Sequence, residues 1–510
     1  MRDNAWSFGV VAEDTEPALT KPPHAPRAPR KFLGFNLSDL LAERRRAGIS
    51  FAVGLIVLLL VQYPAVEQSF LGAPDREMME MAFKLRADAI GGTADPVLFL
   101  DFDDSTLSKL GAATPFSPPL ATVPRATLAE LLDFVRTSPP GHGASVVMMD
   151  VDIAAPPSDG ATGVEKLQAS LAAWAADKAA APLIISREAY PTSTVGMDGP
   201  GLVLPDTPYD AIVRPAPNIY WSEASVLSDQ NGVVRDFTPY QCVITSSGLK
   251  PLYSAALIAY QFVETNQAVL AQAHAKHWMQ DAASSCQTVN TPPLRRGELI
   301  DYHLSLELGF MRRVWPDLDP KWPGFATCDQ SDRTVFRRLS AIDILDAIHG
   351  GGDISRGLLC RHVLIIGGTN ASAGDFIQTP INEMNGSVVL ANAVRGLQLT
   401  HGGLKPIPLI GQVLLLAVVS LAISASAAAT SRARRRYIRL RTGPHKDKLA
   451  HRLAILPLNP LLLNGIIALA AHCFGVALLA ISLNFGLWGF LSAPAFASAI
   501  TETIQEFTDG

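Results

Sequence analysis

Three stretches without a charged residue constrain this chain more than any other feature. Residues 47–66, 406–431 and 453–500 contain no Asp, Glu, Lys or Arg. A helix needs about 20 predominantly apolar residues to cross a bilayer. The first two stretches therefore predict one transmembrane helix each, and the third has room for one or two, so its number of crossings stays open. We expect three or four transmembrane helices and a lipid bilayer as a partner.

Basic residues beside these stretches predict the orientation of the chain. Arg44, Arg45 and Arg46 come directly before the first stretch, and residues 432–452 hold nine Lys or Arg and one acid. Cytoplasmic loops of membrane proteins carry an excess of Lys and Arg. Both segments are therefore predicted to be cytoplasmic, which places residues 67–405 outside.

The rest of the chain divides simply. Residues 1–46 are rich in Pro, Ala and charge, which predicts a disordered cytoplasmic tail, and residues 501–510 form a short second tail. The first stretch lies too far from the start for an ordinary signal peptide, so an uncleaved anchor is expected.

Acidic residues outnumber basic ones in residues 67–405, which argues against a nucleic-acid partner. The basic loop 432–452 is expected to contact anionic lipid.

Residues 67–405 alternate short apolar runs with amphipathic segments. The expected strands are 97–102, 145–149, 182–186 and 363–366, and the expected helices are 77–89, 125–136, 165–177, 251–262, 340–348 and 388–397. Alternation of this kind is typical of βαβ units. The predicted fold class is α/β, with a mainly parallel sheet flanked by helices.

Polar residues follow several of the expected strands. Parallel sheets bind ligands at the carboxyl ends of their strands. The candidate ligand-binding residues near these ends are Asp101, Asp103, Arg125, Asp150, Arg235, Asp375 and Thr379. A structural alternative stays open, because loop acids also cap helices and bind backbone amides. The two arginines could bind an anionic ligand, but in a domain this acidic we expect them to pair with structural carboxylates.

One motif is similar to the active-site motif of an enzyme family. Residues 97–105, VLFLDFDDS, resemble the strand and Asp-x-Asp of haloacid-dehalogenase-like phosphatases. In that interpretation Asp101 is the nucleophile, Asp103 the acid/base and Asp375 a further Mg²⁺ ligand. No Lys follows at an expected strand end to neutralise a phosphate. The chain is therefore predicted not to be an enzyme, with no catalytic residue, no metal and no cofactor.

Four of the five cysteines lie in residues 67–405. A compartment outside the cytoplasm permits their oxidation. Up to two disulfides are expected, with three pairings open. The candidates are Cys242, Cys286, Cys328 and Cys360.

Five motifs follow one another along the chain: FLDFDDSTLSKLG, PRATLAELLDFV, VVMMDVDI, DQNGVVRDF and VLIIGGTNASAGDFIQTPINEMNGSVVLANAV. In this order they resemble the extracellular CHASE sensor domain of type 2, over about residues 75–405. The resemblance implies a receptor of the bacterial inner (cytoplasmic) membrane with residues 67–405 in the periplasm. Family members normally carry a fused cytoplasmic enzyme. Only about ten residues follow residue 500, fewer than the ~50 that a domain needs, so no fused output domain is expected.

The predicted function is signal input without a built-in output. An environmental cue or a protein partner would bind outside, and the spans would signal to a separate cytoplasmic or membrane output protein. A homodimer is left open. The alternatives are a structural or assembly subunit of a membrane complex and the Mg²⁺-dependent phosphatase.

Overall fold

The computed structural model describes an α/β domain and parts of the helices that lead to it. The described residues are 44–62, 73–86, 96–111, 123–154, 159–192, 201–228, 232–263, 279–286, 298–299, 336–350, 359–369, 376–400 and 404–421, with short gaps inside some of these ranges, and positions within 487–501.

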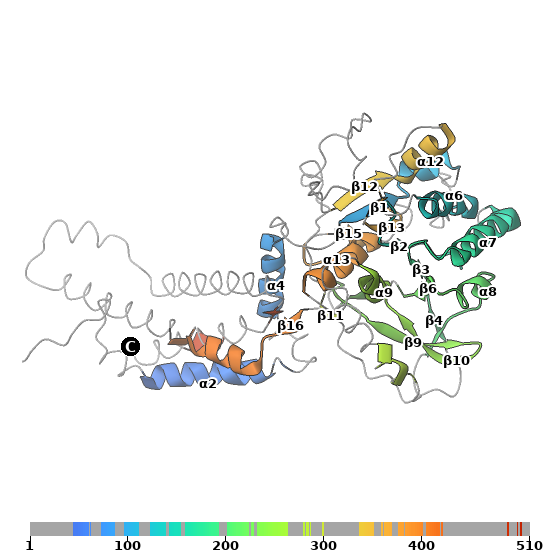
Figure 1. The fold of residues 1–510 in the computed structure, drawn as a ribbon. Helices are drawn as coiled ribbons and strands as arrows, with labels where there is room; N and C mark the ends of the chain where they lie inside the picture. The colour runs from blue at the N-terminus through green and yellow to red at the C-terminus, as the bar shows by residue number, and fades with distance from the viewer. Residues whose placement is uncertain are drawn as a thin grey trace, which may run out of the picture.

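A six-stranded sheet forms the centre of the domain (Figure 1). Every neighbouring pair in it is parallel. Its order is β12-β1-β13-β2-β3-β6, where the strands are β1 (Val97–Asp101), β2 (Val146–Met149), β3 (Leu183–Ser186), β6 (Ile219–Ser222), β12 (Phe336–Ser340) and β13 (Val363–Gly367). The predicted α/β class with a mainly parallel sheet is confirmed, while the edge strands β6 and β12 were not among the expected strands.

Helices cover both faces of this sheet, because successive side chains of each strand point to opposite sides. In β1, Leu98 and Leu100 pack in one buried core, whereas Val97 and Phe99 pack in the other. The first core includes residues of α5 (Asp104–Lys109), α6 (Arg125–Arg136), α7 (Gly160–Ala176), α8 (Asp210–Val213) and α12 (Ala341–Gly350). The second core includes residues of α4 (Ala73–Arg86), α9 (Ala255–Phe262) and α13 (Gly386–Leu399).

Smaller sheets lie beside the central one. The sheet β10-β9-β5-β4 contains β4 (Tyr190–Thr192), β5 (Gly201–Val203), β9 (Tyr240–Thr245) and β10 (Gly248–Tyr253), and the sheet β11-β8-β7 contains β7 (Val226–Ser228), β8 (Val234–Phe237) and β11 (Glu298–Leu299). A hairpin pairs β14 (Phe376–Gln378) with β15 (Glu383–Asn385).

The helix expected at 251–262 begins later than predicted. Pro251 to Tyr253 belong to β10 and pair with β9. The next residue, Ser254, caps α9 by accepting hydrogen bonds from the backbone amides of Ala256 and Leu257. A serine side chain at this position satisfies amides that have no partner within the helix. The apolar run alone did not reveal this strand-to-helix boundary.

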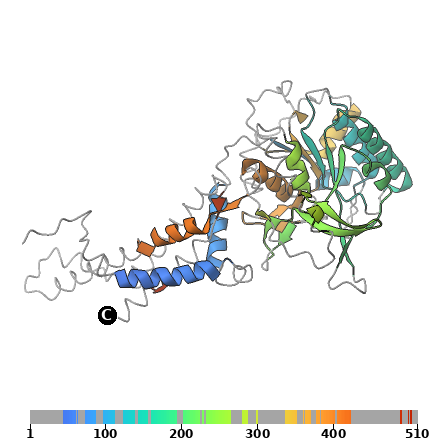
Figure 2. The same cartoon turned by 60° about the horizontal axis from the view of Figure 1, so that its bottom comes forward.

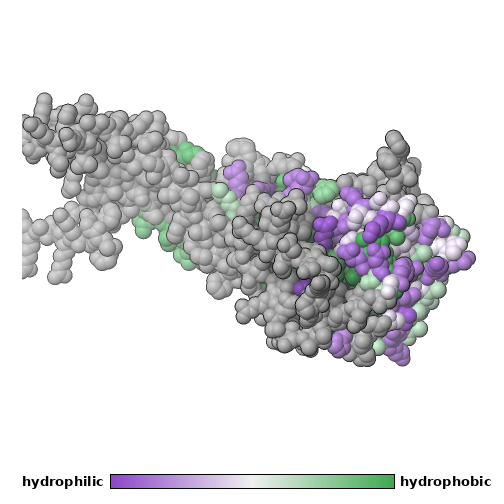
Figure 3. Space-filling model, turned by 90° about the horizontal axis from the view of Figure 1, so that it is seen from above, coloured by the Kyte–Doolittle hydropathy of each residue, from purple (hydrophilic) through white to green (hydrophobic). Residues whose placement is uncertain are grey.

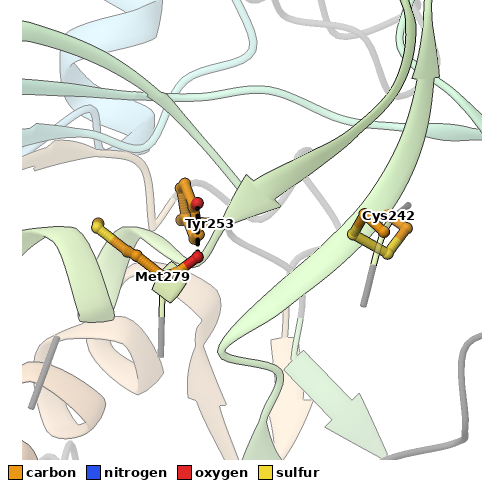
Figure 4. The surroundings of a disulfide bond; sticks show 4 residues. Cys242, Tyr253 and Met279 are labelled. Carbon is orange, nitrogen blue, oxygen red and sulfur yellow. Dashed lines mark hydrogen bonds between the residues drawn. A yellow bond between two sulfur atoms is a disulfide. The ribbon is translucent and has the colours of Figure 1, made fainter. Parts of the chain in front are cut away.

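Cys242 and Cys286 form a disulfide with a Cα–Cα distance of 5.5 Å (Figure 4). Near it, the Tyr253 hydroxyl donates a hydrogen bond to the Met279 carbonyl at 3.3 Å. Cys360 is also disulfide-bonded, and Cys328 lies outside the described residues. The disulfide and the Tyr253 hydrogen bond attach residues 279–286 to the four-stranded sheet.

Two helices extend away from the domain side by side (Figures 1 and 2). They are α2 (Arg44–Leu60) and the helix within residues 409–421. Leu58 and Leu416 are buried in the same core, and Gln62 Nε2 donates to Gln412 Oε1 at 3.3 Å. In the part of the chain that the structure describes, no helix is both long and apolar enough to span a bilayer. The expected spans 47–66, 406–431 and 453–500 therefore stay predictions.

The surface differs between the helices and the domain. Figure 3 shows hydrophilic side chains over much of the coloured surface of the domain and hydrophobic side chains on the part that leads to the helices. Large apolar side chains are exposed on α2 and on residues 409–421, namely Ile49, Ile56, Leu59, Leu60, Leu409, Ile410, Leu414, Val418 and Leu421. These helices therefore present apolar side chains outward as well as toward each other.

Candidate ligand-binding edge of the sheet

Polar residues occupy the carboxyl ends of the central strands on the face covered by α9 and α13. Strand alternation puts them there: Phe99 and Met148 pack in the core of this face, and the residue two places further along each strand is an acid. We call this set the polar edge. It consists of Asp101 of β1, Asp150 after β2, Ser186 of β3 and Arg338 of β12, and Gly367 of β13 lies between Asp101 and Asp150 in the sheet.

Asp101 joins three strands. Its side chain is completely buried, and Oδ1 accepts from the Thr369 amide at 2.7 Å. Oδ2 accepts from Thr369 Oγ1 at 2.6 Å and from Arg338 Nε at 2.5 Å. Burial raises the pKa of Asp101, and the Arg338 charge and the Thr369 hydrogen bonds oppose that shift. With both oxygens engaged, this carboxylate holds β1, β12 and the end of β13 together.

Asp103 caps a helix. It lies beyond β1, and its Oδ1 accepts from the Thr106 amide, Thr106 Oγ1 and Ser105 Oγ, each at 2.8 Å. Burial acts to raise its pKa, but these hydrogen bonds and one from Ser340 prevail and lower it. Asp103 therefore caps the N-terminus of α5, which is the structural role that the sequence left open for it.

This arrangement does not suit the phosphatase interpretation. A carboxylate nucleophile needs an oxygen free to attack, whereas Asp101 accepts from an arginine and a threonine and Asp103 accepts from a helix terminus. Among the described residues, no three His, Cys, Asp or Glu are grouped to hold a metal ion. Asp375 lies outside the described residues.

Asp150 bonds to the first turn of α13. Ser387 Oγ donates to Asp150 Oδ2 at 2.6 Å, and Ser387 itself is buried. Burial raises the pKa of Asp150, while hydrogen bonds from Ser387 and Ser186 act in the opposite direction. Asn385 caps the same helix by accepting from the Ser387 amide at 3.0 Å. The side-chain carboxyl group of Asp150 thus lies at the N-terminus of α13, where burial favours its neutral form.

Gly367 allows this close approach. A Cβ atom at position 367 would lie 2.3 Å from Ser387 Oγ and 3.1 Å from Ser387 Cβ. A contact of 2.3 Å is far inside normal packing distances. The glycine therefore lets the N-terminus of α13 approach the end of β13.

Arg125 lies on the opposite face of the sheet. It is completely buried at the start of α6, where Nη2 donates to the Asp152 carbonyl at 2.9 Å and Nη1 to the Val123 carbonyl at 3.4 Å. Burial lowers the pKa of Arg125, although Tyr209 and nearby acids favour its charged form. The structure does not bring Arg125 to the polar edge, and its contacts fit a structural role.

Arg235 and Thr379 lie away from the polar edge as well. The Arg235 guanidinium, on β8, forms an ion pair with Glu80 of α4. Thr379 is buried just after β14. Of the candidates that the structure describes, only Asp101 and Asp150 belong to the polar edge.

Several residues with central contacts were not among the candidates. Arg338, Thr369, Ser387 and Glu80 each bond to a candidate across more than 150 positions in sequence. One signal was available: Asn385-Gly386-Ser387 places a capping residue directly before the helical pattern. No local pattern pairs the other three with their partners.

The comparison with family models found one match, the CHASE2 domain, over residues 52–425. This match covers more than half of the chain. No curated protein and no solved structure matches the chain significantly.

Proposed function

The chain belongs to the CHASE2 domain family, a family of sensor domains, and from this premise we propose that it is a membrane-bound sensor. In this proposal an extracytoplasmic cue or protein partner acts at the polar edge. The helices then pass the change to a separate output protein in the cytoplasm or the membrane.

The observation that carries the proposal is the course of α13. The helix begins at the polar edge, where Ser387 bonds to Asp150, and ends at Leu399, ten residues before the helix within 409–421. Leu397 and Leu404 pack in the same core as Leu416. Packed interfaces move between discrete arrangements rather than deforming continuously. A shift at the start of α13 would therefore reach the helices that leave the domain.

The input requires a difference in affinity between two states of the domain. The Ser387–Asp150 hydrogen bond offers one such difference, because it holds α13 against the sheet in one position. A cue that bonds to either partner, or that displaces the start of α13, would favour a second position. The oxygens of Asp101 are already engaged, so we assign Asp101 to the scaffold of the edge.

Three features support a place in the bacterial inner membrane with residues 67–405 in the periplasm. CHASE2 domains are typically extracellular parts of membrane proteins. The exposed apolar side chains of α2 and residues 409–421 suit contact with lipid. The Cys242–Cys286 disulfide suits an oxidising compartment.

The proposal is tested by purifying the full-length protein from its native membrane in mild detergent, followed by mass spectrometry. We expect a stoichiometric cytoplasmic or membrane enzyme to accompany it. We also expect Ser387→Ala to retain this enzyme but to change its activity. Recovery of the protein alone would contradict a separate output protein, and recovery with only structural membrane proteins would favour the assembly subunit.

Ser170→Ala is the matched control. Ser170 is also a buried serine whose hydroxyl donates to a carboxylate, Asp133, at 3.0 Å. It lies on α7, on the opposite face of the sheet from α13. An equal change of activity in both variants would point to general destabilisation and would contradict the role given to Ser387.

A further inference from the structure

We infer that the ion pair between Glu80 and Arg235 is the contact through which the domain sets the position of α4, and through α4 that of α2. The inference rests on the proposed function and deepens it, because it names the side chains that would pass the signal to the N-terminal helix. Movement of α13 explains only how a signal would reach the helix within residues 409–421.

The place of α4 is the first argument. Figures 1 and 2 show it between the domain and the pair of helices that extends from it. Met78, Ala82 and Phe83 of α4 are completely buried, in the core that also holds Val234 and Phe237 of β8. The helix is thus part of the domain's packing and also the described element that comes next after α2.

The character of the contacts is the second argument. Apolar burial stabilises α4 on the domain but has no direction, so it permits more than one position of the helix. A charged hydrogen bond between arginine and a carboxylate is geometrically specific. The Arg235 side chain is only 10% exposed and that of Glu80 28%, so the pair is shielded from water. An exposed pair would contribute little, whereas this shielded pair holds the two side chains to each other.

A continuous series of contacts joins this pair to the polar edge. The strand β8 carries Arg235, and Val233, just before it, forms a parallel bridge with Gln378 of β14. Gln378 pairs with Glu383 of β15, and β15 ends at Asn385, the cap of α13. Two residues later, Ser387 bonds to Asp150. Movement of the start of α13 would therefore displace the β14–β15 hairpin, β8 and Arg235.

The test measures the distance between the two helices in the full-length protein in lipid vesicles. Spin labels replace Gln62 and Gln412, whose side chains are in contact, in a Cys473→Ser background. We expect Glu80→Gln to shift the mean distance by about 2 Å, the scale of helix movements in switching proteins. The charge-swapped double variant, Glu80→Arg with Arg235→Glu, should restore the distance.

Glu77→Gln is the matched control, because Glu77 is an exposed glutamate on the same helix, and it should leave the distance unchanged. A lower melting temperature of Glu80→Gln with an unchanged distance would overturn the inference, since the pair would then only stabilise the domain. If Glu80→Gln does not fold, Arg235→Lys, which keeps the charge and loses the planar fork, takes its place.

Ser387→Ala in the same measurement separates this inference from the proposed function. A shift with Ser387→Ala but not with Glu80→Gln would reject the route through α4 and leave the sensor intact. An unchanged distance in both variants would contradict both.

Discussion

Ser387 and Asp150 join the start of the last domain helix to the end of a central strand, through a hydrogen bond of 2.6 Å. The two residues are 237 positions apart in the sequence. Their contact makes the orientation of α13 depend on the state of one carboxyl group. Because burial raises the pKa of Asp150, that state also depends on pH.

Asp150→Asn should flatten part of the pH dependence of stability. As pH rises above the ordinary pKa of aspartate, about 3.9, the unfolded chain loses its proton before the folded one does. The wild-type carboxyl therefore favours folding in acid, and this contribution is lost as pH rises through its raised folded pKa. Asparagine stays neutral and still accepts from Ser387. In thermal melts from pH 4 to pH 8, the melting temperature of the variant should rise relative to that of the wild type as pH increases.

Asp103→Asn provides a control of opposite sign. The pKa of Asp103 is lowered, so its contribution is present above the ordinary pKa and is lost as pH falls through the folded value. This variant should lose stability relative to the wild type at neutral pH and approach it in acid. The same trend in both variants would refute the roles assigned to the two carboxyls.

Asp101→Asn should destabilise the full-length protein by about 2 kcal/mol, because hydrogen bonds to charged groups contribute on that scale. Asparagine carries no negative charge, so its hydrogen bonds with Arg338 and Thr369 are weaker than those of the carboxylate. Urea unfolding measures the loss. Hydrolysis of an aryl phosphate, measured alongside, should not differ between variant and wild type, and a phosphatase activity that Asp101→Asn abolishes would revive the enzyme interpretation.

Gly367→Ala should cost about 1–3 kcal/mol of unfolding free energy, since the new Cβ would overlap Ser387 Oγ. Ser387→Ala removes that oxygen and should relieve part of the clash. A double-mutant cycle of the two substitutions checks this contact directly. Additive effects would mean that α13 does not press on the end of β13.

Removal of the Cys242–Cys286 disulfide by double substitution with Ala should cost about 4 kcal/mol. The bond closes a loop with a sequence separation of 44, and loop-closure entropy predicts a loss of this size. Chemical unfolding of the wild type and the double variant gives the difference. A loss below about 1 kcal/mol would show that residues 279–286 are held mainly by other contacts, such as that of Met279 with Tyr253.

The C-terminal apolar stretch should cross the membrane twice. Leu487 and Trp488 form a short strand, β17 (Leu487–Trp488), parallel to β16 (Lys405–Pro406), which lies between α13 and the helix within 409–421. If residues 432–452 are cytoplasmic, residues 453–486 must return to the side of the domain, and the parallel course of β17 beside β16 directs the chain after Trp488 back toward the bilayer. A reporter fused after Gly510 should therefore be cytoplasmic, and a periplasmic reporter would contradict this topology.

Local patterns in the sequence predicted most of the central architecture. Strands such as Val97–Asp101 are short apolar runs that need burial on both faces. The helix Arg125–Arg136 was predicted with its observed bounds, because its buried leucines recur at helical spacing. The edge strand β12 (FRRLS) has no such run. It carries two arginines, and its place in the sheet depends on pairing with β1, more than 230 positions away.

The candidate site was only half predictable for a related reason. The sequence placed Asp101 and Asp150 at the ends of apolar strands, and the structure has them there, at the polar edge. The sequence could not reveal that Arg338 and Thr369 saturate Asp101, because those bonds depend on sheet order and register. Arg125 and Arg235 were named for their charge alone, which does not tell a ligand-binding arginine from one paired inside the fold.

The order of the central sheet also governs how the domain can form as the chain is made. Strand β1 has only β12 and β13 as neighbours, so residues 97–101 stay unpaired until residues 336–340 and 363–367 have been synthesised. Non-local pairing of this kind slows folding and exposes apolar strands in the meantime. If the domain is exported as it is made, β1 therefore stays unpaired outside the cytoplasm until almost the whole domain has been exported. During this time chaperones and proteases can bind it.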